Sequence, residues 1–219
     1  MQYVKQITGI SFKLLILLMA FSISAIAEEQ TPEPVLSLAQ QAMKAELENQ
    51  ASKAKTKLNK KRLSEIYLFY EENEFLPVWT TSDGISQKAN SVIDILSRAE
   101  EHALDPADYA IAALQNTPKA GDDAIRAAYE VRFSMSLVAF AQHLNAGRVN
   151  PKTVTRENVI YPEAISALKI LQQTKSTGNV VAYLRLLAPH TPRYERLRLA
   201  MAAYKNLAAS GGWETLEAG

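Results

Sequence analysis

Apolar residues recur at helical spacing along most of the chain, and one stretch is apolar on two sides. Between residues 123 and 147 one row of apolar residues has steps of three or four, the period of one α-helical face: Ile125, Tyr129, Phe133, Leu137, Phe140 and Leu144. A second row lies on another side, at Val131, Met135 and Val138. A surface helix needs only one apolar stripe. We therefore predict a central helix that is buried on both sides and ends at Gly147, because glycine adopts left-handed conformations at low cost.

Shorter helical patterns flank this central helix, and no alternating pattern is long enough to require a sheet. Prolines and glycines separate the patterns, and we expect further helices at 63–73, 91–103, 106–114, 162–177, 180–187 and 192–210. Residues 152–161 could form a loop or a short strand. The predicted fold class is all-α, an irregular multi-helix domain at residues 62–219 around one central buried helix, preceded by a signal peptide.

The N-terminus is typical of a secretory signal peptide at residues 1–27. Lys5 and Lys13 precede an apolar run at 14–21 that is short for a transmembrane helix. The run leads to Ala25 and Ala27, the small-x-small pattern at which signal peptidase cleaves. We expect cleavage after Ala27. The alternative is an uncleaved anchor in the inner membrane, and lipoprotein anchoring is excluded because the chain has no cysteine.

Residues 28–61 are expected to form a polar lead-in followed by a loosely attached basic helix. The apolar stripe at 35–58 is thin and consists largely of alanine, so this helix should bury little surface. Its second half carries a basic run of Lys53, Lys55, Lys57, Lys60, Lys61 and Arg62. The run could contact anionic phospholipid or cell-wall carboxylates. We favour the simpler interpretation of a solvated helix face.

Composition excludes several classes of function. The chain has no cysteine, so disulfides, thiolate metal sites and cysteine nucleophiles are absent. Its formal net charge of +1 gives no bulk attraction to nucleic acid. His102, His143 and His190 lie far apart and lack the close spacing of a zinc motif. There is no glycine-rich phosphate loop and no serine elbow, so we expect no metal, no cofactor and no catalytic residue.

Four segments, taken in order, resemble one protein family. They are Phe69-Tyr70 followed by Phe75-x-Pro77-Val78-Trp79-Thr80, His102-Ala103-Leu104-Asp105-Pro106-x-Asp108-Tyr109, Gly147-Arg148-Val149-Asn150-Pro151, and Leu187-Ala188-Pro189-His190-Thr191-Pro192-x-Tyr194-x-x-Leu197-Arg198 continuing to Gly211-Gly212-Trp213. Together they resemble the N-terminal scaffold domain of the large multi-domain L,D-transpeptidases of Gram-negative bacteria. Two positions depart from the family pattern: Ala103 stands where glycine is usual, and Glu214 replaces a usual proline.

The resemblance implies a role in the cell wall without catalysis on this chain. Members of the family continue into a peptidoglycan-binding module and a catalytic domain with a cysteine nucleophile, whereas this chain stops at Gly219. We therefore expect a non-catalytic scaffold domain, truncated or split, that acts in peptidoglycan (murein) crosslinking and cell wall organisation in the periplasm. Its partners would be peptidoglycan or a catalytic L,D-transpeptidase chain. The alternative is an independent periplasmic helical binding protein or an enzyme with an unrelated site.

Without a nucleophile, such a chain acts by holding something, and four residues are candidates for that surface. Sugar rings stack on aromatic faces and carboxylates pair with the planar guanidinium group, which points to Trp79, Arg148, Tyr194 and Trp213. For two of the four residues, a structural role is a more common explanation than a role in binding. Trp79 is more often a core residue, and Arg148 is more often a cap of the helix that ends beside it.

Overall fold

The structure of the protein is a computed structural model that describes residues 36–119, 121–149 and 162–213. The expected signal peptide with Ala25 and Ala27, and the ambiguous segment 152–161, lie outside these ranges. Within them the fold is all-α, as predicted, apart from one hairpin of two-residue strands. None of the described helices is both long enough and apolar enough to cross a membrane.

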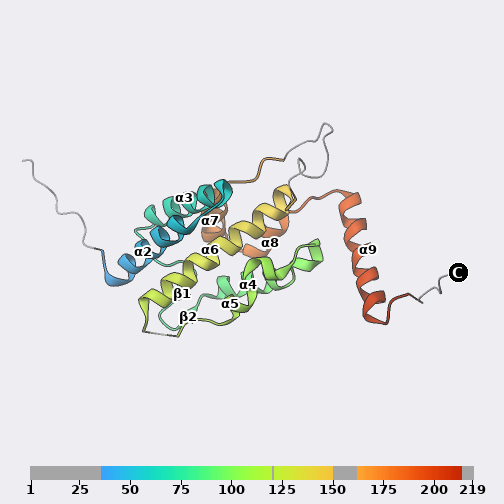
Figure 1. The fold of residues 1–219 in the computed structure, drawn as a ribbon. Coiled ribbons are helices and arrows are strands. Elements are labelled where there is room, and N and C mark those ends of the chain that lie inside the picture. Colours follow the sequence, from blue (N-terminus) through green and yellow to red (C-terminus); the bar gives the residue numbers. More distant parts are fainter. Residues whose placement is uncertain (1–35, 120, 150–161, 214–219) are drawn as a thin grey trace, which may run out of the picture. The chain divides into compact units, whose positions relative to one another are not determined.

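The central helix is α6 (Asp123–Ala146), and the other helices pack around it (Figure 1). Asp122 caps its first turn by accepting from the Ile125 amide at 3.0 Å, and Gly147 follows its last turn with φ 84°. Both predicted apolar rows are largely buried, with Phe133, Leu137 and Val138 completely inaccessible, but Met135 in the middle of the second row is only half-buried. The burial of the first row does not extend to its first residue, Ile125, whose side chain is 57% exposed.

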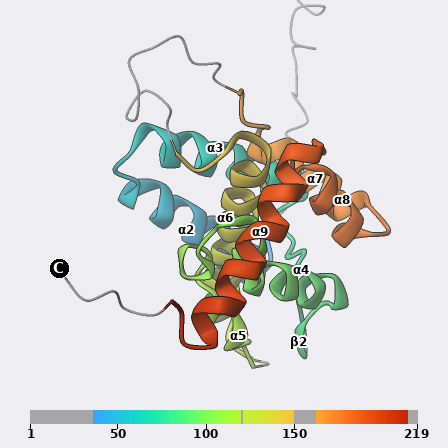
Figure 2. The same ribbon diagram turned by 90° about the vertical axis from the view of Figure 1, so that its right-hand side faces the viewer.

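Two helices cover one side of α6, namely α2 (Leu38–Lys53) and α3 (Lys57–Glu71) (Figure 2). They replace the expected single stripe at 35–58, because the chain becomes extended at Ala54 and Thr56 caps a new helix. The expectation of a loosely attached helix is wrong. Met43 and Leu47 of α2 are each 1% exposed in the common core, and the expected boundary after Lys61 falls inside α3.

The chain then crosses to the other side of α6 in short pieces. Strands β1 (Thr80–Thr81) and β2 (Gly84–Ile85) pair antiparallel, and α4 (Gln87–Ser97) follows. α4 ends earlier than predicted and continues as the short 3₁₀ helix η1 (Ala99–His102). The helix expected at 106–114 is divided into η2 (Pro106–Tyr109) and α5 (Ile111–Gln115), because Ala110 adopts a left-handed conformation with φ 52°.

Three helices complete the described chain: α7 (Ala167–Ser176), α8 (Val180–Leu186) and α9 (Pro192–Ala209). We predicted that this helix begins at Pro162, but α7 begins after its cap residue, Ser166. It adds Ile170 and Leu171 to the core. α9 begins as predicted, with Thr191 as cap and Pro192 in the first turn. No residue of α9 is buried, so this helix lies against the domain without joining its core.

Candidate functional site

Trp79 is a core residue, so it is not part of a binding surface. Its side chain is completely buried, and the indole Nε1 donates to the Ser134 hydroxyl at 2.8 Å. The same hydroxyl lies 2.8 Å from the phenol oxygen of Tyr70. These bonds satisfy the polar atoms that a buried tryptophan and tyrosine bring into the core.

A buried carboxylate organises the segment around Trp79. Glu130 of α6 is completely inaccessible and accepts from the amides of Trp79 and Thr80, each at 2.9 Å. It also accepts from the Val78 amide and from the hydroxyls of Thr80 and Tyr70. Burial raises the pKa of Glu130, and the donors from Val78 to Thr80 oppose that shift. The first motif of the chain therefore has a structural role, which is to attach residues 78–80 to α6.

Arg148 pairs with a carboxylate from another motif. Its guanidinium nitrogen lies 2.8 Å from the Asp108 carboxylate, so the second and third motifs meet at the C-terminal end of α6. Beside this pair, the Tyr109 hydroxyl lies 2.9 Å from Nδ1 of His143. Burial lowers the pKa of His143, and the neighbouring arginines contribute in the same direction. His143 is therefore held in its neutral form at neutral pH.

Arg62 joins this group from α3, and the sequence did not single it out. Its Nε donates to the side-chain oxygen of Gln142 at 2.6 Å, across 80 residues of sequence. In the sequence, Arg62 is the last member of a basic run that we assigned to solvent. The only sequence feature that could have identified it is its position at the end of that run, immediately before the buried Leu63.

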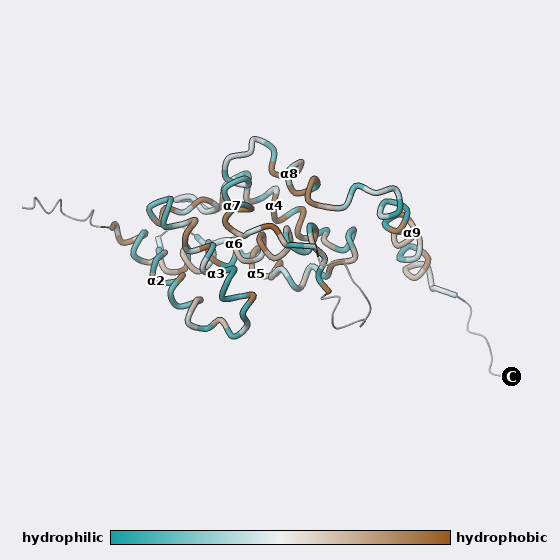
Figure 3. The backbone as a smooth tube through the Cα atoms, turned by 90° about the horizontal axis from the view of Figure 1, so that it is seen from above, coloured by the Kyte–Doolittle hydropathy of each residue, from teal (hydrophilic) through white to brown (hydrophobic). Residues whose placement is uncertain are grey.

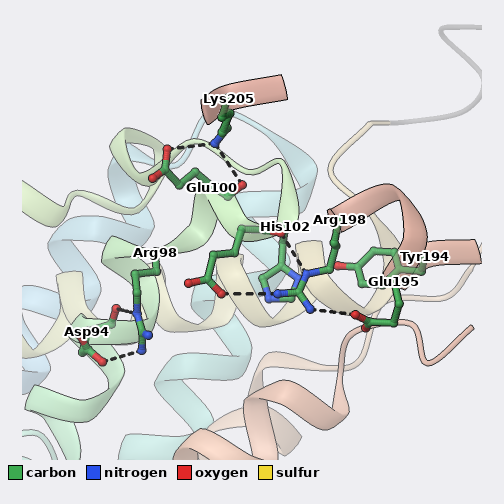
Figure 4. Close-up of polar contacts among 9 residues, drawn as sticks. Asp94, Arg98, Glu100, His102, Tyr194, Glu195, Arg198 and Lys205 are labelled. Atoms are coloured by element: carbon green, nitrogen blue, oxygen red, sulfur yellow. Dashed lines mark hydrogen bonds and ion pairs between the residues drawn. The ribbon is translucent and has the colours of Figure 1, made fainter. Parts of the chain in front are cut away.

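Tyr194 connects α9 to η1 (Figure 4). Its hydroxyl lies 2.6 Å from Nδ1 of His102, with the two rings stacked at 6.1 Å between centroids. Two ion pairs extend the same contact, Arg198 with Glu101 at 3.5 Å and Lys205 with Glu100 at 3.0 Å. The second and fourth motifs therefore meet here, through contacts that are mainly polar.

Trp213 lies on a surface that the rest of the described chain leaves uncovered. Its side chain is 65% exposed and packs against Tyr204, with ring centroids 5.9 Å apart. α9 carries apolar and polar positions side by side (Figure 3). The apolar positions line a shallow hollow of about 510 Å³, which we call the α9 face: Leu197, Ala200, Met201, Tyr204, Ala208 and Trp213.

The four candidate residues do not form one site, because each has its own contacts: Trp79 in the core, Arg148 with Asp108, Tyr194 with His102, and Trp213 with Tyr204. Among the described residues, no group of histidine and acidic side chains could hold a metal ion.

Comparison with known proteins gives one match. The sequence model of a family described as the Scaffold domain matches residues 64–201, which is more than half of the chain. No curated protein and no solved structure matches the chain. The matched range contains the first three motifs and the start of the fourth, on which the resemblance to L,D-transpeptidase scaffold domains rests. The chain belongs to the Scaffold domain family.

Proposed function

We propose that this protein is a non-catalytic scaffold of murein crosslinking in the periplasm, and that its α9 face binds a catalytic L,D-transpeptidase module. Membership of the Scaffold domain family and the four motifs support the connection to L,D-transpeptidases. The α9 face is the observation that carries the binding role.

Single exposed apolar residues are ordinary on a protein surface, but the α9 face is continuous. Leu197 is 62% exposed, Tyr204 61% and Trp213 65%, and all three line the same hollow. Contiguous apolar surface with aromatic residues at its centre is typical of protein interfaces, where tryptophan and tyrosine contribute most of the binding energy. The polar contacts of α9 with η1 leave this face uncovered by other described residues.

The absence of cysteine supports a role without catalysis. L,D-transpeptidases of the family that this chain resembles form a thioacyl intermediate, and this chain has no thiol to form one. The purified protein, incubated with disaccharide tetrapeptides, should give no 3→3 crosslinked dimer and no released D-alanine by mass spectrometry. Either product would contradict the proposal.

The binding role is tested with a purified catalytic L,D-transpeptidase and two single variants. Trp213→Ala and Tyr204→Ala should each weaken binding about tenfold or more, since truncating a central aromatic residue costs on the order of 2 kcal/mol. Leu38→Ala is the matched control, because Leu38 is 76% exposed on α2 and outside the face. Melting temperatures should not change. A wild-type protein that binds no transpeptidase would refute the proposal.

A second candidate is an independent periplasmic binding protein. It is favoured by one observation, a cleft lined by arginines on the surface formed by α2, α3 and α6.

A further inference from the structure

A cleft of about 340 Å³ lies where residues of α2, α3, α6 and η2 meet, and it contains two arginines. Arg62 comes from α3 and Arg132 from α6, 70 positions further along the chain. The side chains of Asn59 and Gln50 line the cleft beside them. This volume is at the lower end of the roughly 300–1,000 Å³ of small-molecule sites.

The cleft has a surplus of positive charge. Among the described residues, neither Arg62 nor Arg132 forms an ion pair. The one carboxylate that lines the cleft, Asp108, is already paired with Arg148 at 2.8 Å. The residues that line the cleft carry two positive charges and one negative charge, a net charge of +1, and the negative charge is already neutralised by Arg148. An anionic ligand would compensate this charge without displacing an internal partner.

Arg62 is held in place for such a ligand. Its Nε donates to Gln142 at 2.6 Å, which fixes the plane of a half-buried guanidinium group. Burial removes part of the water around the Arg62 guanidinium group, at a cost in free energy, and lowers its pKa. A carboxylate that accepts two parallel N–H bonds relieves this cost and matches the geometry of the guanidinium group.

The remaining lining distinguishes a peptide from other anions. Ala128, Met135 and Ala139 give the cleft a small apolar surface, and the amides of Gln50 and Asn59 can pair with peptide groups. Asp108 opposes a densely charged polyanion such as nucleic acid. The combination suits a short peptide with a free carboxylate and small apolar side chains.

We propose that this cleft binds the free carboxylate of a short peptide, with Arg62 and Arg132 as the carboxylate ligands. The inference rests on the proposed function for the source of that peptide, which would be the stem peptide of murein. It concerns a surface distinct from the α9 face, since the two share no lining residue.

The test is calorimetric titration of the full-length protein with a disaccharide tetrapeptide. Arg132→Gln is the main variant, because Arg132 is exposed and its loss should leave the melting temperature unchanged. It should weaken binding about tenfold to a hundredfold, the usual value of a charge-assisted contact. Arg193→Gln, which removes the same charge from an exposed position on α9, should bind like the wild type.

Two further ligands identify the recognised group. The same disaccharide tetrapeptide with its carboxylates amidated should bind at least tenfold more weakly, and the disaccharide without peptide should not bind. Equal binding of the disaccharide, equal binding by Arg132→Gln, or no binding by the wild type would each overturn the inference. Trp213→Ala keeps the cleft intact, so it should lose transpeptidase binding and retain peptide binding. A wild-type protein that binds the peptide but no transpeptidase would refute the proposed docking and leave the cleft assignment standing.

Discussion

At the level of single residues, the least expected feature is Glu130, a carboxylate in the centre of a hydrophobic core. Ionised carboxylates are costly to bury unless their oxygens are fully hydrogen-bonded. Here both oxygens accept bonds, from the amides of residues 78–80 and from two hydroxyls. The side chain replaces the strand or helix partner that these three amides would otherwise need.

Glu130→Gln tests this role at nearly constant volume. The glutamine amide nitrogen would replace an acceptor and face the donors that now bind it, leaving at least one donor unsatisfied. We expect a loss of about 3 kcal/mol in the free energy of unfolding, measured in urea. Glu48→Gln on the exposed face of α2 is the control and should change stability by less than about 0.5 kcal/mol. Equal midpoints for both variants would show that Glu130 is dispensable.

A substitution at Ala103 should raise the free energy of unfolding, whereas Glu130→Gln should lower it. It adopts a left-handed conformation with φ 58°, which glycine adopts at lower cost. A Cβ atom in this region costs about 1–2 kcal/mol, whereas glycine adds about 0.5–1 kcal/mol of unfolded-state entropy. Ala103→Gly should therefore stabilise the protein by up to about 1 kcal/mol in thermal or urea unfolding. The same change at Ala45, exposed within α2, should destabilise it by about 1 kcal/mol. Destabilisation at both positions would contradict the strain argument.

At the level of elements, periodicity found the helices but missed several of their ends, including the capped starts of α3 at Thr56 and α7 at Ser166. α9 was located correctly because Thr191 and Pro192 mark its start, and α6 because Gly147 marks its end. The break at Ala54 between α2 and α3, and that at Ala110 between η2 and α5, involve alanine, which favours helix continuation. At Ala110 no side-chain cap marks the break, so tertiary packing sets it, whereas the break at Ala54 has a local signal in the Thr56 cap that periodicity alone does not detect.

The candidate site was only partly predictable for a similar reason. Trp213 is exposed, as a binding role would require, and Trp79 is buried, as the core interpretation that we favoured for it requires, although both are tryptophans beside helix-breaking residues. What separates them is Glu130, whose partners lie 50 to 60 residues earlier in the chain. Arg62 and Arg132 likewise come together only because α3 packs near α6. Contacts between residues so far apart in the sequence produce no recognisable pattern in the spacing of residue types.

Salt should weaken the attachment of α9 to the rest of the domain. Its ion pairs with Glu100 and Glu101 are partly exposed, so each contributes at most about 1 kcal/mol and is screened as the Debye length falls to about 3 Å at 1 M salt. We expect amide hydrogen exchange at 192–209 to accelerate several-fold between low salt and 1 M NaCl, with α6 unaffected. The pair Glu100→Gln and Glu101→Gln should reproduce this at low salt.

The matched control for that experiment is Asp94→Asn, which removes the ion pair between Asp94 and Arg98 at 2.7 Å without touching α9 (Figure 4). Exchange in α9 should then remain at the wild-type rate. If α9 exchanges at one rate under all conditions, its attachment depends on the Tyr194 contact and not on charge.

At the scale of the whole molecule, the folding unit is longer than the family match. The match begins at residue 64, inside α3, whereas the described residues from Leu36 onward form one compact unit. α2 contributes Met43 and Leu47 to the core, and Gln40 donates to the Glu74 carbonyl at 2.7 Å. The basic run therefore lies on helices that are integral to the domain.

Truncation tests this extension directly. A chain that begins at Leu36 should unfold at the same temperature as one that begins at Glu28. A chain that begins at Arg62 loses α2 and the first turn of α3, and it exposes the face of α6 that α2 covers. Each buried large side chain contributes roughly 1.5–3 kcal/mol, so this loss is comparable with the roughly 5–15 kcal/mol that keeps a domain folded.

We therefore expect the chain that begins at Arg62 to show no cooperative thermal transition by circular dichroism. Met43→Ala and Leu47→Ala in the full chain provide the point-by-point check, because each should cost about 2–5 kcal/mol through the cavity it leaves. Leu58→Ala, at a residue of α3 that is 52% exposed, is the control and should cost far less. A stable, cooperatively folding chain from Arg62 onward would mean that α2 is an accessory helix after all, and that the family match alone defines the domain.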